Sequence, residues 1–267
     1  MEKIQSLQNN RIKNVEKLFS KSKERKDQNL FVVEGAREVS LAMAGSFAID
    51  TVFICPELFN KIDFLQLQTD IQNYQLIEVT HPVFQKIAYR ENSDGILALA
   101  RPKTHILNDL KLPGNPFIIV LEAVEKPGNL GAVLRTADAA QVDAVIVCDP
   151  LTDIYNPNVI RSSLGCVFTV PVAVASRSDT FLFLKENRIR IIATDLQASQ
   201  FYHETDFTQS CALIMGTEAD GLTSFWTDCA DIRIKIPMRG QIDSLNVSVS
   251  TAVLTFEAMR QRSFAQR

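Results

Sequence analysis

Apolar residues gather in short, continuous runs along the second half of the chain. The runs occupy residues 117–121, 144–148, 167–174, 190–194, 212–215 and 232–236. Each run has the length and composition of a buried β-strand. Segments near residues 130–140, 159–164 and 179–186 have the spacing of helices. Continuous apolar strands that alternate with helices predict a parallel sheet covered by helices on both faces, so this half is expected to form an α/β domain.

The first hundred residues alternate between shorter elements. Ile12, Val15, Leu18 and Phe19 fit one face of a helix. Strands are expected at residues 30–33, 51–55, 75–79 and 96–100, and helices at 36–44, 57–67 and 82–88. This pattern predicts a small α/β domain over residues 1–101. Residues 102–116 contain three prolines and a glycine and are interpreted as a linker, so that the second domain covers residues 117–267.

The last predicted helix, residues 245–262, carries more apolar residues than one face needs. One stripe consists of Leu245, Val249, Ala252, Phe256 and Met259. Further apolar residues widen that stripe, namely Val247, Val253, Leu254 and Ala258. A helix that is apolar nearly all round is buried. A terminal helix is seldom covered on every side by its own domain, so a second subunit is expected to cover it.

Composition and charge indicate the cellular compartment and the partners to expect. The 267 residues are 46% hydrophobic, which suffices for one or two packed domains. No apolar run reaches the roughly 18 residues of a membrane span, and the N-terminus has no apolar signal core. We therefore expect a cytoplasmic protein with no membrane partner. The net charge is −3, yet residues 1–26 hold eight basic residues against three acidic ones. This cluster is either a solvated helix face or an arm that contacts phosphates.

Common catalytic and metal motifs are absent from the sequence. The five cysteines form no CxxC pair and the three histidines have no ligand spacing, so neither a disulfide framework nor a metal site is expected. The chain has no GxGxxG loop, no GxxxxGK[ST] loop and no GxSxG elbow. Standard dinucleotide sites, phosphate-loop chemistry and a hydrolase triad are therefore not supported.

Three polar clusters follow strand-like runs. They are NLGAVLRTADA at residues 129–139, GTEADGL at 216–222 and the segment IPMRGQIDSLNVSVSTAVLTFEAM at 236–259. Loops at the ends of buried parallel strands meet at one edge of a sheet, which suggests one composite site. Single residues remain ambiguous at this level. Arg135 either pairs with a carboxylate such as Asp138 or reaches a cleft, and Asn129 is either a helix cap or a site residue.

In this order, the three clusters resemble the signature motifs of the SpoU (TrmH) family, the RNA ribose 2′-O-methyltransferases of the SPOUT superfamily. The N-terminal stretches QNNRIKNVEKL and FVVEGAREV are similar to the substrate-binding extension of that family. The resemblance implies a deep trefoil knot in the C-terminal domain, an N-terminal RNA-binding domain, S-adenosyl-L-methionine as cofactor and a homodimer joined through the last helix.

The resemblance also implies roles for particular residues. Cofactor-binding positions are Thr194, Gly216, Ile236, Met238, Leu245 and Ser248. Catalytic positions are Arg135, Asn129, Glu218, Ser244 and Asn246. Arg135 matches the motif arginine that the family proposal makes the base for the ribose hydroxyl. Arginine stays protonated in proteins, so positioning the ribose and neutralising phosphate is the role expected here.

The function implied is methylation of a ribose 2′-hydroxyl in structured RNA, with ribosomal RNA favoured over transfer RNA. A non-catalytic RNA-binding protein that retains the fold is one alternative. A kinase-like transferase that uses the Arg135 loop for nucleotide phosphates is another.

Overall fold

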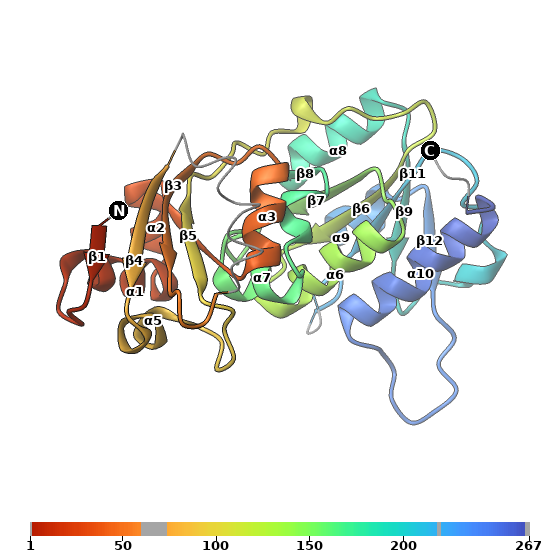
Figure 1. The fold of residues 1–267 in the computed structure, drawn as a ribbon. Helices are drawn as coiled ribbons and strands as arrows, with labels where there is room; N and C mark the ends of the chain where they lie inside the picture. Colours follow the sequence, from red (N-terminus) through yellow and green to blue (C-terminus); the bar gives the residue numbers. More distant parts are fainter. Residues whose placement is uncertain (1, 60–73, 218–219, 265–267) are drawn as a thin grey trace. The chain divides into compact units, whose positions relative to one another are not determined.

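The computed structural model describes residues 2–59, 74–217 and 220–264 (Figure 1). The chain forms two compact units. Unit 1 contains Met1–Thr104 and also Asp153–Thr169, and unit 2 contains His105–Thr152 and Val170–Arg267. None of the helices in the described ranges has the length and apolarity of a membrane span.

Unit 1 is built around a five-stranded mixed sheet. Its strand order is β1-β4-β3-β5-β2. The strands are β1 (Glu2–Ile4), β2 (Phe31–Glu34), β3 (Ile49–Ile54), β4 (Gln75–Val79) and β5 (Ile96–Ala100). The helices are α1 (Asn10–Ser20), α2 (Ser22–Gln28), α3 (Ala36–Ala44), α5 (His81–Ile87) and α7 (Pro157–Ser162). The four strands expected from the sequence are present, and β1 pairs with β4 as an additional edge strand.

Local sequence accounts for the first helix. Ile12, Val15 and Leu18 are fully buried on one face, as their spacing predicted. The Asn9 side chain accepts a hydrogen bond from the Arg11 N–H at 2.8 Å and caps the first turn. The helix expected at residues 57–67 lies largely outside the described residues.

The segment Asp153–Thr169 packs into unit 1, although the sequence analysis placed it in the C-terminal domain. Tyr155 stacks on Phe31 with ring centroids 4.2 Å apart, and Phe168 meets Phe47 edge-on at 5.1 Å. The buried Arg25 pairs with Asp153 at 2.7 Å. Aromatic burial therefore joins this segment to unit 1.

The same packing changes one predicted strand. The sequence predicted a strand over residues 167–174, but Cys166–Phe168 is a 3₁₀ helix and only Val172–Ala175 forms β8. Phe168 packs in the aromatic cluster of unit 1 and does not join the sheet. The strand predicted for residues 167–171 was therefore wrong.

Unit 2 contains a seven-stranded, fully parallel sheet, which confirms the predicted sheet type. Its order is β10-β12-β9-β11-β6-β7-β8. The remaining strands are β6 (Phe117–Glu122), β7 (Ala144–Cys148), β9 (Arg190–Thr194), β10 (Gln200–Phe201), β11 (Cys211–Met215) and β12 (Ile232–Lys235). The short edge strand β10 was not predicted.

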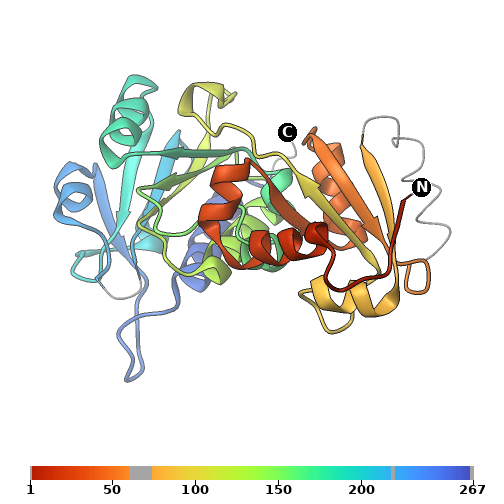
Figure 2. The ribbon, with the colours of Figure 1, turned by 90° about the vertical axis from the view of Figure 1, so that its left-hand side faces the viewer.

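Helices cover both faces of this sheet (Figure 2). The helices are α6 (Pro127–Ala139), α8 (Arg177–Glu186), α9 (Ser224–Cys229) and α10 (Val247–Gln261). Leu184 of α8 and Trp226 of α9 pack against Ile118 and other inward residues of one face. On the opposite side, α6 and α10 pack against each other. The arrangement leaves the carboxyl ends of the strands open for loops, which is where the site lies.

Candidate active site

A cavity of about 340 Å³ opens at the carboxyl ends of β9, β11 and β12. Parallel strands bring these ends to the same edge of the sheet, so their following loops converge. Thr194 ends β9, Met215 ends β11 and Lys235 ends β12, and all three line the cavity. The segment before α10 closes the remaining side through Asp243 and Leu245. The volume falls within the range of about 300–1,000 Å³ typical of small-molecule sites.

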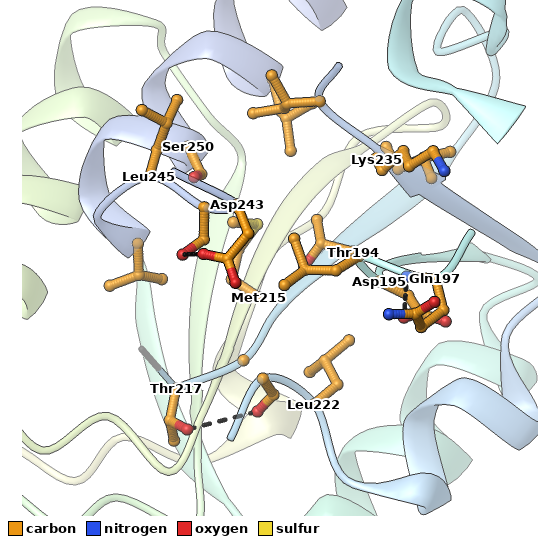
Figure 3. A pocket seen from close by; sticks show the side chains of 18 of the residues that line it. Thr194, Asp195, Gln197, Met215, Thr217, Leu222, Lys235, Asp243, Leu245 and Ser250 are labelled. Carbon is orange, nitrogen blue, oxygen red and sulfur yellow. Dashed lines mark hydrogen bonds between the residues drawn. The ribbon is translucent and has the colours of Figure 1, made fainter. Parts of the chain in front are cut away.

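The lining combines an apolar interior with a polar rim. Its apolar residues are Leu196, Met215, Leu222, Ile234, Ile236, Met238, Leu245, Val247 and Leu254. Figure 3 shows Asp195 and Gln197 on one side of the cavity and Asp243 on the other. The hydroxyl of Thr194 donates to the Ile214 carbonyl at 2.9 Å, so it is held by the sheet itself. Such a site suits a ligand with a flat apolar part and polar substituents.

A tight hairpin forms one wall of the cavity. The Thr217 N–H donates to the Gly221 carbonyl at 3.0 Å, and the Gly221 N–H donates back to Thr217 at 3.2 Å. Gly216 lies directly against this turn: a Cβ at that position would sit 2.2 Å from the Gly221 carbonyl carbon. Only glycine permits this approach of two backbones. Glu218, expected to be catalytic, lies outside the described residues.

A buried carboxylate anchors the other end of the same loop. Glu122, the last residue of β6, is 3% exposed. Its two oxygens accept hydrogen bonds from the Thr223 N–H at 2.9 Å and the Thr223 hydroxyl at 2.7 Å. Arg177 lies 3.8 Å from the carboxylate. Because Thr223 follows the hairpin and directly precedes α9, Glu122 ties the loop that carries Gly216 to the sheet.

Two predicted catalytic residues meet beside the cavity. The Asn246 amide donates to the Asn129 side-chain oxygen at 3.2 Å and so joins the start of α10 to α6. The Asn246 oxygen accepts from the Ser248 N–H at 3.0 Å and from its hydroxyl at 2.6 Å, which caps α10. Asn246 stands between Leu245 and Val247, which both line the cavity. Asn246 therefore caps α10 and at the same time lies beside the cavity.

Arg135 is exposed on α6 and is not part of the cavity lining. Within the described ranges no ion pair or side-chain hydrogen bond engages it, and the ion pair with Asp138 considered from the sequence does not form. A guanidinium that is not engaged by a carboxylate is available to bind phosphate or ribose groups of a substrate.

The structure gathers most of the predicted cofactor positions. Lining the cavity are Thr194, Gly216, Ile236, Met238 and Leu245, together with Ser244, which was expected to be catalytic. The Ser244 hydroxyl donates to Asp243 at 3.0 Å. Ser248 is not a lining residue in the described part of the chain, and it acts within the cap of α10.

Several lining residues were not predicted. They include Asp195, Gln197, Lys235, Asp243, Val247 and Ser250. Asp195 directly follows β9 and Lys235 ends β12. Their position at the end of a buried strand is the feature of the sequence that could have predicted them as lining residues. Asp243 and Ser250 become lining residues only because the start of α10 lies across the strand ends.

The fold and site define a parallel-sheet α/β protein with a ligand cavity at the carboxyl ends of its strands, accompanied by a second small α/β unit. The model of the SpoU rRNA Methylase family matches residues 116–256, and that of the MRM3-like substrate binding domain matches residues 9–98. The chain belongs to the SpoU rRNA Methylase family, which confirms the resemblance found in its motifs.

Known proteins are similar over nearly the whole chain. The Bacillus subtilis "23S rRNA (guanosine(2553)-2′-O)-methyltransferase RlmP" is 32% identical over 96% of this chain and 98% of its own length. A solved "RNA 2′-O ribose methyltransferase" is 38% identical, with a TM-score of 0.85 over 98% of this chain and 99% of that one. An "AdoMet bound rRNA methyltransferase" from Sinorhizobium meliloti is 28% identical, with a TM-score of 0.88 over 97% of both chains.

Proposed function

We propose that the protein transfers a methyl group from S-adenosyl-L-methionine to a ribose 2′-hydroxyl in ribosomal RNA. The observation that carries this proposal is the cavity itself, which the second and third family motifs enclose. Relatives that match over both units are named for ribosomal RNA and for 2′-O-methylation. This favours ribosomal RNA over transfer RNA.

The residues present fit the cofactor chemically. S-adenosyl-L-methionine has a flat adenine ring, ribose hydroxyls and a charged amino-acid end. The apolar lining around Ile236 and Leu245 suits the ring, and the rim carboxylates Asp195 and Asp243 suit hydroxyl and ammonium groups. Gly216 lets the Thr217–Gly221 turn lie close against the end of β11 and so shapes this wall of the cavity. When bound, the cofactor supplies an electrophilic methyl group.

The protein must then position the ribose and help its hydroxyl lose a proton. The planar guanidinium of Arg135 would hold the substrate phosphate and ribose and stabilise the developing negative charge on the oxygen, while the released proton passes to water. The Asn129–Asn246 pair, at 3.2 Å, fixes the start of α10 next to the cavity and presents amide groups for orienting the substrate. Ser244 and Glu218 complete the set that we assign to this task.

We propose that two copies associate through α10. Val249 and Phe256 on this helix are 48% and 44% exposed, and Ala252 and Met259 are partly exposed beside them. A contiguous apolar stripe of this kind is typical of an interface. Phe256→Asp is expected to shift the protein from dimer to monomer in sedimentation experiments, whereas Leu182→Asp, a change at an equally exposed residue on α8, is the matched control. A Phe256→Asp protein that stays dimeric would exclude this interface.

The two domains have different tasks in this proposal. Residues 1–101 bind the RNA, residues 102–116 link the two domains, and residues 117–267 carry out the methyl transfer. The chain of this second domain forms a trefoil knot. Exposed lysines on α1, on α2 and between them support the first assignment, because they pair with no carboxylate among the described residues; they are Lys13, Lys17, Lys21, Lys23 and Lys26. Ribosomal RNA is made and modified in the cytoplasm, which is therefore the proposed location.

The decisive experiment uses purified protein, methyl-labelled S-adenosyl-L-methionine and total RNA from a strain that lacks the protein. Label is expected in ribosomal RNA, at one ribose 2′-oxygen, and Arg135→Ala protein is the control. Label on a base would contradict the reaction, and label in transfer RNA would contradict the substrate. A non-catalytic RNA-binding role predicts no cofactor binding in calorimetry.

A further inference from the structure

A wide groove lies on unit 1 and shares no lining residue with the cavity already described. It measures about 800 Å³ and runs between α5 and the loop that follows it. Its lining includes His81 and Gln85 of α5, Tyr89 and Asn92 of the loop, and Leu58. Tyr89 is 48% exposed.

Two buried carboxylates fix the backbone around Tyr89. Glu34, 6% exposed at the end of β2, accepts the Tyr89 N–H at 2.8 Å and the Arg90 N–H at 3.3 Å. Glu38, 2% exposed on α3, pairs with the Arg90 guanidinium at 2.5 Å. Burying carboxylates is costly unless they are fully engaged. Here Glu34 fixes the backbone that carries the exposed Tyr89 side chain, and Glu38 fixes the side chain of its neighbour Arg90, so the position of Tyr89 is preorganised.

The ring of Tyr89 is also supported from behind. Phe19 of α1 stacks on it with centroids 6.0 Å apart and planes 12° apart. The Arg161 guanidinium lies 5.6 Å from the ring centroid. Neither Phe19 nor Arg161 lines the wide groove, whereas Tyr89 does. Tyr89 therefore packs against Phe19 and Arg161, and its exposed part lines the groove.

We infer that Tyr89 is a stacking platform that receives an unpaired nucleobase of the RNA. This inference rests on the proposed function, because it takes RNA to be the substrate. Single-stranded RNA is recognised by stacking of splayed bases on aromatic side chains, with hydrogen bonds to the base edges. Gln85, Asn92 and His81 line the groove and supply donors and acceptors for such an edge.

The charges of the groove favour a base over a phosphate. Arg90 lines the groove too, but its charge is paired with Glu38, whereas Glu91 and Asp94 would repel a phosphate group and could accept hydrogen bonds from the amino groups of a base. The unpaired lysines of α1 and α2 and the exposed Arg161 provide cations for the RNA backbone. The base and the backbone are thus assigned to different parts of unit 1.

The test compares binding of two RNA probes to the full-length protein by fluorescence polarisation. One probe is a hairpin pool with a randomised unpaired loop, and the other is a fully paired duplex with the same stem. Tyr89→Ala is expected to weaken hairpin binding about tenfold to a hundredfold and to leave duplex binding unchanged. Tyr89→Phe is expected to bind like the wild type, because it keeps the ring. Lys23→Ala should lower the salt dependence of binding by about one unit of slope, while Tyr89→Ala should not.

Three results would overturn the inference. They are wild-type hairpin affinity of Tyr89→Ala, an equal loss on hairpin and duplex, and a Tyr89→Phe variant as weak as Tyr89→Ala. Thermal melting and calorimetry with S-adenosyl-L-methionine show whether unit 1 and the cofactor cavity are intact. If the wild type fails to methylate RNA but the Tyr89 variants still separate the two probes, the proposed function fails and the stacking site stands.

Discussion

Gly216→Ala is expected to destroy the cofactor cavity while preserving the rest of the fold. The new Cβ would lie 2.2 Å from the Gly221 carbonyl carbon, 2.3 Å from its oxygen and 2.4 Å from the Leu222 nitrogen. Ordinary contact begins at 3.4 Å, so the hairpin must retreat by about an ångström. All three atoms belong to backbone, which has no rotamer to change.

Two outcomes of that clash determine the size of the effect. Retreat of the hairpin strains the reciprocal Thr217–Gly221 hydrogen bonds, which are each worth about 1 kcal/mol. If the hairpin stays, overpacking costs about 1–3 kcal/mol. Retreat moves the cavity wall away from its ligand position, and overpacking makes the ligand-binding conformation of the wall less stable. We expect affinity for S-adenosyl-L-methionine to fall about tenfold to a hundredfold, which corresponds to about 1.4–2.8 kcal/mol.

Isothermal titration calorimetry with the cofactor measures this directly. Gly114→Ala is the matched control, because a Cβ at Gly114 meets no atom within 4 Å. Its affinity and melting temperature should equal those of the wild type. Circular dichroism should show that Gly216→Ala keeps its secondary structure. Wild-type cofactor affinity in Gly216→Ala would refute the reasoning, since it would mean that the hairpin is not a wall of the cofactor site.

Three further changes test other parts of the site. Arg135→Ala should lower methyl transfer about a hundredfold or more with little change in cofactor affinity. Arg135→Lys should also fail, because the point charge of a lysine does not replace the planar guanidinium. Wild-type turnover by either variant would reject the proposed role of Arg135. Glu122→Ala leaves the N–H and hydroxyl of Thr223 unpaired and should cost about 2–3 kcal/mol in urea unfolding, with Glu122→Gln milder; equal stability would show that the anchor is dispensable. Burial raises the pKa of the Cys148 thiol to about 12, so at pH 8 a maleimide should modify Cys148 only after unfolding, and labelling of native protein there would contradict its burial.

Much of unit 2 was determined by the sequence alone. Continuous apolar runs such as Phe117–Glu122 are fully buried strands of a parallel sheet, because both faces of such a strand need apolar cover. The three motifs were also sufficient to assign the family and to select Gly216 and Leu245, which both line one cavity. These predictions succeeded because strand ends in a parallel sheet always share an edge.

Only the tertiary structure decided the remaining features. Hydrophobic periodicity reports local burial but not which distant partner provides it, so the stacking of Tyr155 on Phe31 and the transfer of Asp153–Thr169 to unit 1 were not foreseen. The same limit applies to Gly216, whose need for glycine comes from the Gly221 backbone across a turn and not from its own conformation. Nothing in the local sequence singles out Tyr89, whose backbone N–H is held by the buried Glu34 of another element and whose ring packs on Phe19 of a third. These features depend on contacts between segments that are far apart in the chain, and no local sequence pattern encodes such contacts.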